Sequence, residues 1–340
     1  VACVCILSAC QKESFLPEQN QTKKITLSAT MPQGSSETKM ALIQNGRNIQ
    51  LRWEDTDQLR LCLVQRKIKI KQVVSVKNIS EDRKRAEFDL TIPESFSTGT
   101  FELYGLYGGQ LSDTNPTEVI LPLLPNESSL SGIQNRKATV LSFHQDSIST
   151  EHPSISVPLK HMGSLFCIKI KNAGGASLTN LGSIQLAASE NGWAFNNTVG
   201  GDHFNLSNGT FVSETISGTN LPFPLNSTSI ASGDTLTVWG WFPCVETTLW
   251  PELQLKMYDN GASLIATSTN SKPARNNYTL NGKAYYFYAL WNGSTLSFTD
   301  TTLSPPPSIE DLTLNGDLLD CEAGNDFLGM VYARSGNIYY

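Results

Sequence analysis

The chain has 340 residues, of which 16% are charged and 39% are hydrophobic, and its formal net charge at pH 7 is −6. This length is too great for one ordinary β-sandwich and predicts two domains of about 100 to 200 residues each. The modest charge, with no basic stripe interleaved with aromatic residues, excludes the electrostatic pattern of nucleic-acid binding. We therefore expect two globular domains and no nucleic-acid partner.

The first ten residues are mostly apolar and end in small residues before a polar stretch that begins at Gln11. This pattern is typical of the end of a signal peptide, here truncated. Residues 7–10, Leu-Ser-Ala-Cys, resemble the bacterial lipobox, which implies a lipid on Cys10 and a firm membrane anchor. The alternative is that Cys10 is an ordinary cysteine in a cleaved secretory leader. Residues 11–24 are polar and predict a flexible tether.

Apolar residues recur at every second position through much of the first half of the chain. The pattern covers residues 25–31, 49–53, 86–92 and 101–104. Period two is typical of strands with one buried face. In residues 68–71 lysines take the alternate positions, which predicts an edge strand protected against pairing with other chains.

The second half repeats this pattern in residues 166–170, 236–239, 253–257 and 285–288. Between the predicted strands lie Asn-Gly pairs, which tolerate positive φ and are typical of hairpin turns. These pairs are Asn208-Gly209, Asn260-Gly261, Asn281-Gly282 and Asn292-Gly293. The sequence therefore predicts an all-β fold with few helices.

Changes in composition divide the chain further. We expect an N-terminal β-sandwich over residues 25–152 and a C-terminal one over residues 153–304, after the signal peptide of residues 1–10 and the tether. Three prolines then introduce a C-terminal segment, residues 305–340, which is predicted to be a final strand of the chain or a strand donated to a neighbour.

Motifs of catalysis and metal binding are missing from the sequence. The four histidines lie far apart and none forms HExxH, and neither a GxSxG nor a phosphate-binding glycine loop occurs. The one close cysteine pair, Cys3 and Cys5, lies in the apolar leader, so no CxxC metal-ligand spacing occurs. We therefore expect no metal, no cofactor and no enzymatic activity, although a site assembled only in space stays open. Cys62, Cys167, Cys244 and Cys321 are expected to be buried free thiols, with disulfide pairing as the alternative.

Several of these features occur in an order that resembles the fimbrillin-like proteins of Bacteroidetes. They are the lipobox, the strand of residues 25–31 followed by Glu37-Thr38-Lys39, the strand that ends in Trp53, and the histidine-led strand of residues 161–170. The tail after Pro305 matches no part of that family's pattern.

The resemblance implies two tandem β-sandwich domains of transthyretin-like, Greek-key type. It implies a lipid-anchored fimbrial subunit or adhesin at the outer membrane and cell surface, whose partners are other fimbrial subunits, joined by β-strand exchange, and host or bacterial surface ligands. In polymerising members the first strand is removed by cleavage after a loop arginine, and Arg47 occupies the matching place. The alternative is that Arg47 is an ordinary solvated arginine.

A second hypothesis is a glycan-binding outer-membrane lipoprotein of a polysaccharide-uptake system. Tryptophan faces stack on sugar rings when exposed, and Trp193 and Trp250 are the candidates. Trp239 and Trp241 share one strand face and are expected to pack in the core. Residues 146–148 and 234–236 resemble a short O-glycosylation signal of this bacterial group, which makes Ser147 and Thr235 candidate acceptors.

Overall fold

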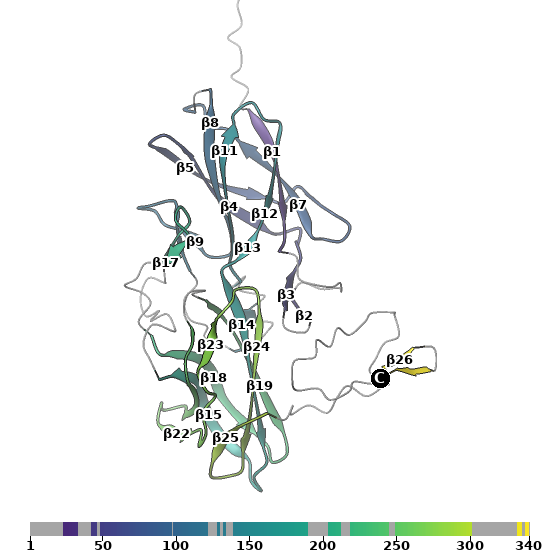
Figure 1. The fold of residues 1–340 in the computed structure, drawn as a ribbon, viewed down its shortest axis with the longest axis vertical. Helices are drawn as coiled ribbons and strands as arrows, with labels where there is room; N and C mark the ends of the chain where they lie inside the picture. The colour runs from purple at the N-terminus through teal and green to yellow at the C-terminus, as the bar shows by residue number, and fades with distance from the viewer. Residues whose placement is uncertain are drawn as a thin grey trace, which may run out of the picture.

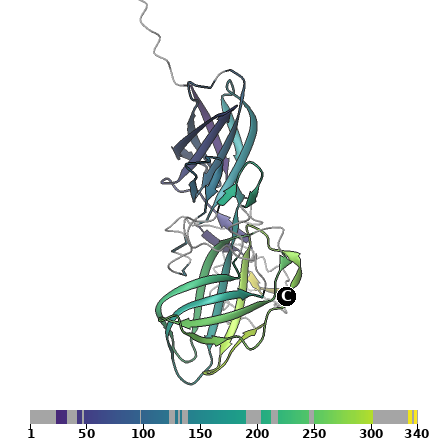
Figure 2. The same cartoon turned by 90° about the vertical axis from the view of Figure 1, so that its left-hand side faces the viewer.

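The computed structural model confirms an all-β fold, in which strands form nearly all of the regular structure. The residues that the structure describes are 23–32, 42–45, 48–96, 98–121, 128–129, 132–133, 139–189, 203–211, 218–244, 249–300, 332–334 and 337–339. Two bodies of packed sheets are stacked along the longest axis of the molecule (Figure 1), and the view turned by 90° shows the same two bodies (Figure 2).

The first body is a sandwich of a four-stranded and a five-stranded sheet. The four-stranded sheet has the order β12-β1-β7-β6, formed by Ser154–Pro158, Lys24–Thr30, Arg85–Thr91 and Asn78–Ile79. The five-stranded sheet has the order β13-β11-β8-β4-β5, formed by Lys160–His161, Leu141–Ser149, Thr100–Tyr107, Gln58–Gln65 and Ile68–Ser75. Their facing side chains, among them Leu27, Phe88, Leu61 and Leu103, form one buried core.

The second body pairs two four-stranded sheets. One has the order β19-β14-β24-β25, formed by Thr235–Pro243, Gly163–Asn172, Ala284–Trp291 and Leu296–Thr299. The other has the order β18-β15-β21-β22, formed by Asn220–Ile230, Leu178–Ala188, Leu253–Asp259 and Leu264–Thr267. Phe166, Ile184, Phe223 and Leu255 lie in the core between them.

A small sheet joins the two halves of the sequence. Its order is β17-β16-β10-β9, formed by Thr210–Phe211, His203–Asn205, Glu118–Ile120 and Gln110–Leu111. β9 and β10 come from the first half, whereas β16 and β17 follow β15 of the second. His203 Nδ1 lies 3.5 Å from Glu118 Oε2 across this junction. The remaining two-stranded ribbons are β2–β3 (Leu42–Asn45, Asn48–Leu51), β20–β23 (Leu249–Trp250, Arg275–Tyr278) and β26–β27 (Tyr332–Arg334, Asn337–Tyr339).

The structure corrects the predicted boundary between residues 152 and 153. β12 pairs in parallel with β1, from Thr26↔Ser154 to Thr30↔Pro158, and His161 of β13 pairs with Leu141 of β11. These strands complete the first sandwich, so the second begins at Gly163. The histidine-led motif of residues 161–170 therefore begins in the first sandwich, because long-range pairing with β11 places His161 there.

The Asn-Gly turns are formed largely as predicted. Gly209, Gly282 and Gly293 have φ values of 69°, 74° and 100°. At the fourth pair the positive φ falls instead on Ala262, at 62°, while Asp259 Oδ1 accepts hydrogen bonds from the amides of Gly261 and Ser263. The aspartate side chain therefore organises this turn.

Candidate strand-exchange site

β1 occupies the interior of its sheet although it comes first in the chain order of the strands. It pairs antiparallel with β7 along its whole length, Lys24↔Thr91 to Thr30↔Arg85, and in parallel with β12 on its other side. Further backbone bonds tie its ends: Ile92 N–H donates to Lys23 O, and Met31 N–H donates to Lys84 O, each at 2.8 Å. Removing β1 would therefore leave an open slot between β7 and β12.

The inward face of β1 is fully buried. Ile25, Leu27, Ala29 and Met31 have exposed fractions of 1%, 0%, 0% and 2%, while Thr26 and Ser28 on the other face are half-buried. Full burial of each large aliphatic side chain stabilises the fold by about 1.5–3 kcal/mol. The slot under β1 is thus an apolar groove, which requires either this strand or another with the same alternation.

Trp53 forms much of the groove's floor beneath the second half of β1. Its ring is fully buried, and Nε1–H donates to Ala29 O at 3.2 Å. The ring packs edge-on against Phe88 and Tyr107, at centroid distances of 5.3 and 5.5 Å. β3 ends at Leu51, two residues before Trp53, so this tryptophan follows the strand that was predicted to contain it.

A buried carboxylate fixes the loop that carries Trp53. Asp57 has no exposed surface, and its carboxylate accepts hydrogen bonds from Glu54 N–H at 2.8 Å and from Tyr107 OH at 3.2 Å. Burial, together with the negative charge of Asp57, raises the pKa of Tyr107 well above its usual range. Tyr107 therefore stays a neutral donor, and the loop is held in place at any physiological pH.

The ribbon that follows β1 in the chain belongs to neither sheet of the first sandwich, although Leu51 at its end is buried in the first core. Among the described residues β2 and β3 pair only with each other, and Asn45 is matched with Asn48. Arg47 lies between these two partners in the sequence and outside the described residues. A cut after Arg47 would separate β1 and β2 covalently from all later strands, so that β1 would be held by non-covalent contacts alone.

An open cleft of about 610 Å³ lies where β1 ends. Met31, Pro32, Val157, Leu159 and His161 contribute to its lining. The cleft is therefore continuous with the β1–β12 side of the groove, and a longer strand in the position of β1 would extend into it.

The other predicted site residues are scattered. Cys10 and Trp193, like Arg47, lie outside the described residues. Ser147 and Thr235 are both exposed; Ser147 lies in a β-bulge of β11 with φ 53°, and Thr235 begins β19. The structure places them in different sandwiches, so they form no common site, and their modification stays a prediction.

The glycan-stacking role predicted for Trp250 is contradicted by its burial. The side chain is 7% exposed and packs against Tyr285 at a centroid distance of 4.7 Å, with Phe166 and Phe287 nearby. Both faces of the Trp250 ring therefore lie inside the second core, where they are not accessible for stacking on a sugar. Trp239 and Trp241 are buried as predicted, and they lie on the face of β19 that joins the first core.

Three of the four cysteines in question are free and buried, as predicted: Cys62, Cys167 and Cys244. Cys321 lies outside the described residues. Burial raises the pKa of Cys62 to about 11, against the opposing effect of Lys69 and Lys71, and raises that of Cys167 to about 12. The nucleophilic thiolate is thus strongly disfavoured at both positions.

We expect iodoacetamide at pH 8 to leave Cys62 and Cys167 unmodified in the folded protein and to alkylate both in urea. The reason is that burial excludes the reagent and, by raising both pKa values, keeps the thiols protonated. Peptide mass mapping measures each cysteine separately. Modification of either in the folded protein, at a rate near that in urea, would contradict their assignment to the core.

Clusters of histidine, cysteine and carboxylate suited to a metal ion do not occur within the described part of the chain. In that same part, helices of the length and hydropathy needed to cross a membrane are also missing.

Comparison with known proteins gives structural similarity only. No family model and no curated protein matches the chain. A candidate cell adhesion protein from Bacteroides ovatus is 14% identical, with 82% of this chain and 95% of that one covered and a TM-score of 0.48. A candidate cell adhesion protein from Bacteroides uniformis is 12% identical, with 83% and 97% covered and a TM-score of 0.45. The fimbrial anchor protein Mfa2 from Porphyromonas gingivalis is 10% identical, with 82% and 96% covered and a TM-score of 0.41.

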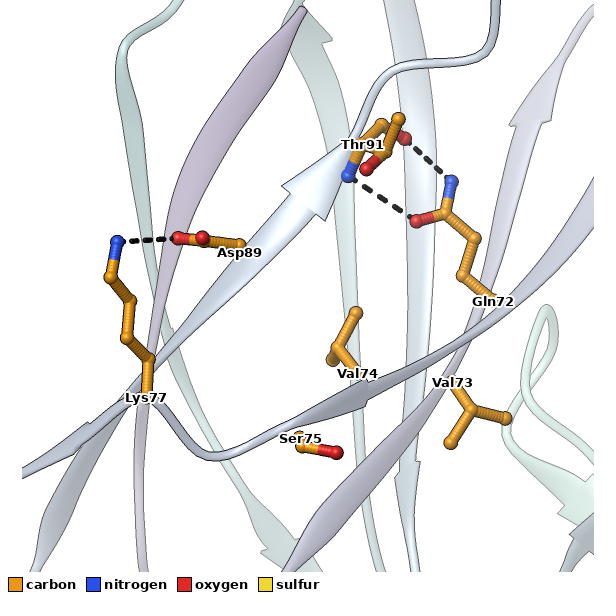
Figure 3. A pocket seen from close by; sticks show the side chains of 7 residues that line it. All are labelled: Gln72, Val73, Val74, Ser75, Lys77, Asp89 and Thr91. Atoms are coloured by element: carbon orange, nitrogen blue, oxygen red, sulfur yellow. Dashed lines mark hydrogen bonds and ion pairs between the residues drawn. The ribbon is translucent and has the colours of Figure 1, made fainter. Parts of the chain in front are cut away.

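Sequence reasoning missed two features of the surface. One is an open cleft of about 510 Å³ between β5 and β7, whose lining includes Gln72, Val74 and Thr91 (Figure 3). The other is an apolar patch on the β20–β23 ribbon, where Leu249, Tyr278 and Leu280 are 45%, 52% and 45% exposed. Leu249 and Tyr278 are register partners although 29 positions separate them in the sequence. Only the pairing brings them together, so no local pattern could have indicated the patch.

Proposed function

We propose that this protein is a fimbrial subunit or adhesin of the cell surface, anchored by a lipid at Cys10, in which β1 is the exchangeable strand. The observation that carries the proposal is the position of β1. It is an interior strand with a fully buried face, yet it precedes the other strands of its sandwich and is followed by a ribbon whose two strands flank Arg47 in the sequence.

This connectivity supports exchange for a physical reason. A cut after Arg47 leaves the rest of the sandwich as one continuous chain, so only non-covalent contacts must be replaced. An incoming strand that alternates apolar and polar residues would regain the backbone bonds to β7 and β12 and fill the same apolar positions. An empty slot would expose the apolar groove to water and leave backbone groups of β7 and β12 without their partners. Binding of a new strand is therefore favourable once β1 has left.

The same cut has a second consequence. Cys10 and β1 lie on the same side of Arg47, so the lipid would depart with the strand. Processing would thus release the subunit from the membrane and open its groove in one step, whereas an unprocessed chain would remain as a membrane-bound anchor. The partners in this proposal are like subunits, and surface ligands of host or bacterial cells for the adhesive role.

The test is N-terminal sequencing and mass analysis of protein from the membrane fraction and from sheared surface filaments. We expect filament protein to begin at Asn48 and membrane protein to carry a lipid on Cys10. Arg47→Ala should abolish the Asn48 terminus and the filament form. Arg52→Ala, which changes a nearby arginine, should leave both intact. Filaments built from chains that retain residues 11–47 would refute the exchange of β1.

The glycan-binding alternative gains no support from the described residues, because Trp250 is buried in the second core.

A further inference from the structure

The structure describes four Asn-Gly pairs of the chain, which begin at Asn208, Asn260, Asn281 and Asn292. An asparagine that precedes glycine can react with its own backbone, because the glycine amide nitrogen has no neighbouring side chain to block its approach to the asparagine side-chain carbon. In a folded protein this reaction has two requirements. The side-chain carbonyl must lie beside the amide, and the amide must be free to react.

The first requirement is met at Asn292, which begins the loop that joins β24 to β25 (Figure 1). Its Oδ1 accepts hydrogen bonds from Ser294 N–H at 3.0 Å, from Ser294 Oγ at 3.1 Å and from Thr295 N–H at 2.8 Å. The first of these bonds makes an Asx turn, in which the side-chain carbonyl takes the place of a backbone carbonyl and lies beside the next amide. Three donors on one oxygen also stabilise the negative charge that develops there when the carbon is attacked.

The second requirement is met by the amide of Gly293. This N–H donates to no atom of the described residues, whereas the preceding N–H, of Asn292, donates to Thr295 O at 3.1 Å. The φ of Gly293 is 100°, a conformation that glycine adopts without strain. Asn292 and Gly293 are both exposed, so water and hydroxide have access to them. The nucleophile therefore has no hydrogen bond to give up before it attacks.

In the other three pairs the glycine amide is already bonded. Gly209 N–H donates to Asn205 O at 2.9 Å. Gly282 N–H donates to Gly163 O, also at 2.9 Å. In the turn that Asp259 organises, the glycine amide donates to that carboxylate at 2.9 Å, and the negative charge of the carboxylate opposes loss of the amide proton. Each of these amides must lose a hydrogen bond before it can react.

The turn at Asn208 is a natural control for the turn at Asn292. Its Oδ1 accepts hydrogen bonds from Thr210 N–H at 3.1 Å and from Thr210 Oγ1 at 2.7 Å, and both Asn208 and Gly209 are exposed. The two sites thus share the Asx turn, a hydroxyl donor and access to water. They differ in the state of the glycine amide and in the one further backbone donor at Asn292.

We propose that Asn292 is a site of spontaneous modification, at which the Gly293 nitrogen attacks the Asn292 side chain. Hydroxide removes the amide proton of Gly293, and the nitrogen forms a bond to Asn292 Cγ. The bond from Cγ to Nδ2 breaks, and the leaving group takes a proton from water and departs as ammonia. Water then opens the cyclic imide at either carbonyl, which gives aspartate or isoaspartate. The reaction requires no enzyme, replaces a neutral amide by a carboxylate, and is independent of β1 and Arg47.

The isoaspartate product lengthens the main chain by one carbon at a crowded turn. A Cβ built on Gly174 would lie only 2.8 Å from Gly293 Cα, and Ala173 N–H donates to Trp291 O at 2.7 Å. The loop of residues 173–174 therefore packs directly against the reacting pair. β25 follows this turn as the last strand of its sheet, with Leu296 fully buried. We expect isoaspartate to loosen β25, and aspartate, which keeps the main-chain length and an oxygen acceptor, to leave it in place.

The experiment follows deamidation at each asparagine separately, by peptide mass mapping of the full chain kept at pH 8, both folded and in urea. In urea the four pairs should react at similar rates, because no fixed turn then distinguishes them. In the folded protein Asn292 should react at least about fivefold faster than Asn208, since giving up one amide hydrogen bond slows a reaction by about this factor. A rate at Asn292 equal to or below that at Asn208 in the folded protein would overturn the proposal.

Two variants test the effect of the modification on the fold. Asn292→Ser lacks the reactive amide but keeps a side-chain oxygen for the turn, so its Tm should not change during storage at pH 8. Freshly prepared Asn292→Asp carries the new charge without the longer main chain and should have the Tm of the parent. The parent should lose Tm as isoaspartate accumulates at position 292. Accumulation of isoaspartate there with no change in Tm, or an equal loss of Tm in Asn292→Ser, would contradict the predicted loosening of β25.

Discussion

Trp53→Ala is expected to lower the free energy of unfolding of the first sandwich by about 3–5 kcal/mol. The ring is fully buried beneath β1, contacts Phe88 and Tyr107, and donates to Ala29 O, so its removal leaves a cavity and an unpaired carbonyl. Urea unfolding followed by far-UV circular dichroism measures the loss.

Trp53→Phe is the matched control for this substitution. It keeps an aromatic ring in the floor of the groove but removes the donor to Ala29 O, so a smaller loss, of about 1–2 kcal/mol, is expected. Equal effects of the two variants would assign the role of Trp53 to its hydrogen bond alone. A loss below about 1 kcal/mol for Trp53→Ala would contradict the packing described for β1.

Leu27→Asp is expected to destabilise the first sandwich by at least about 4 kcal/mol, because it places a carboxylate without a partner in the core. Leu27 lies at the centre of β1 with no exposed surface. Ser28→Asp makes the same change one residue later, on the half-buried outer face, and should cost less than about 1 kcal/mol. Differential scanning calorimetry of the two variants compares the faces directly; similar shifts in Tm would show that β1 is not seated as described.

Local sequence patterns predicted the strands well where one face is buried. Period two in residues 25–31 and 86–92 corresponds to β1 and β7, whose even and odd positions alternate between core and surface. The lysines of residues 68–71 correctly marked β5 as an edge strand. In both cases the pattern reflects the environment of individual side chains, which the sequence records residue by residue.

Long-range pairing could not be predicted in this way. The contact of β1 with β12 joins Thr26 to Ser154, and the contact of β10 with β16 joins Glu118 to Asn205. Neither leaves a local signal, so the domain boundary was placed ten residues too early and the joining sheet was missed. The prediction that Trp250 stacks on a glycan was wrong for a related reason. The number of tryptophans in a segment does not show which of them will be buried in the core.

The central claim is that another strand can take the place of β1, and strand replacement in a cut chain tests it most directly. A specific protease site introduced between Arg47 and Asn48 allows the folded protein to be nicked and then incubated with labelled peptide 23–32. We predict that the peptide is incorporated and the fragment 1–47 is released, whereas the peptide with Leu27→Asp is excluded and that with Ser28→Asp is accepted. Retention of fragment 1–47 without incorporation of peptide, or equal incorporation of all three peptides, would contradict the account.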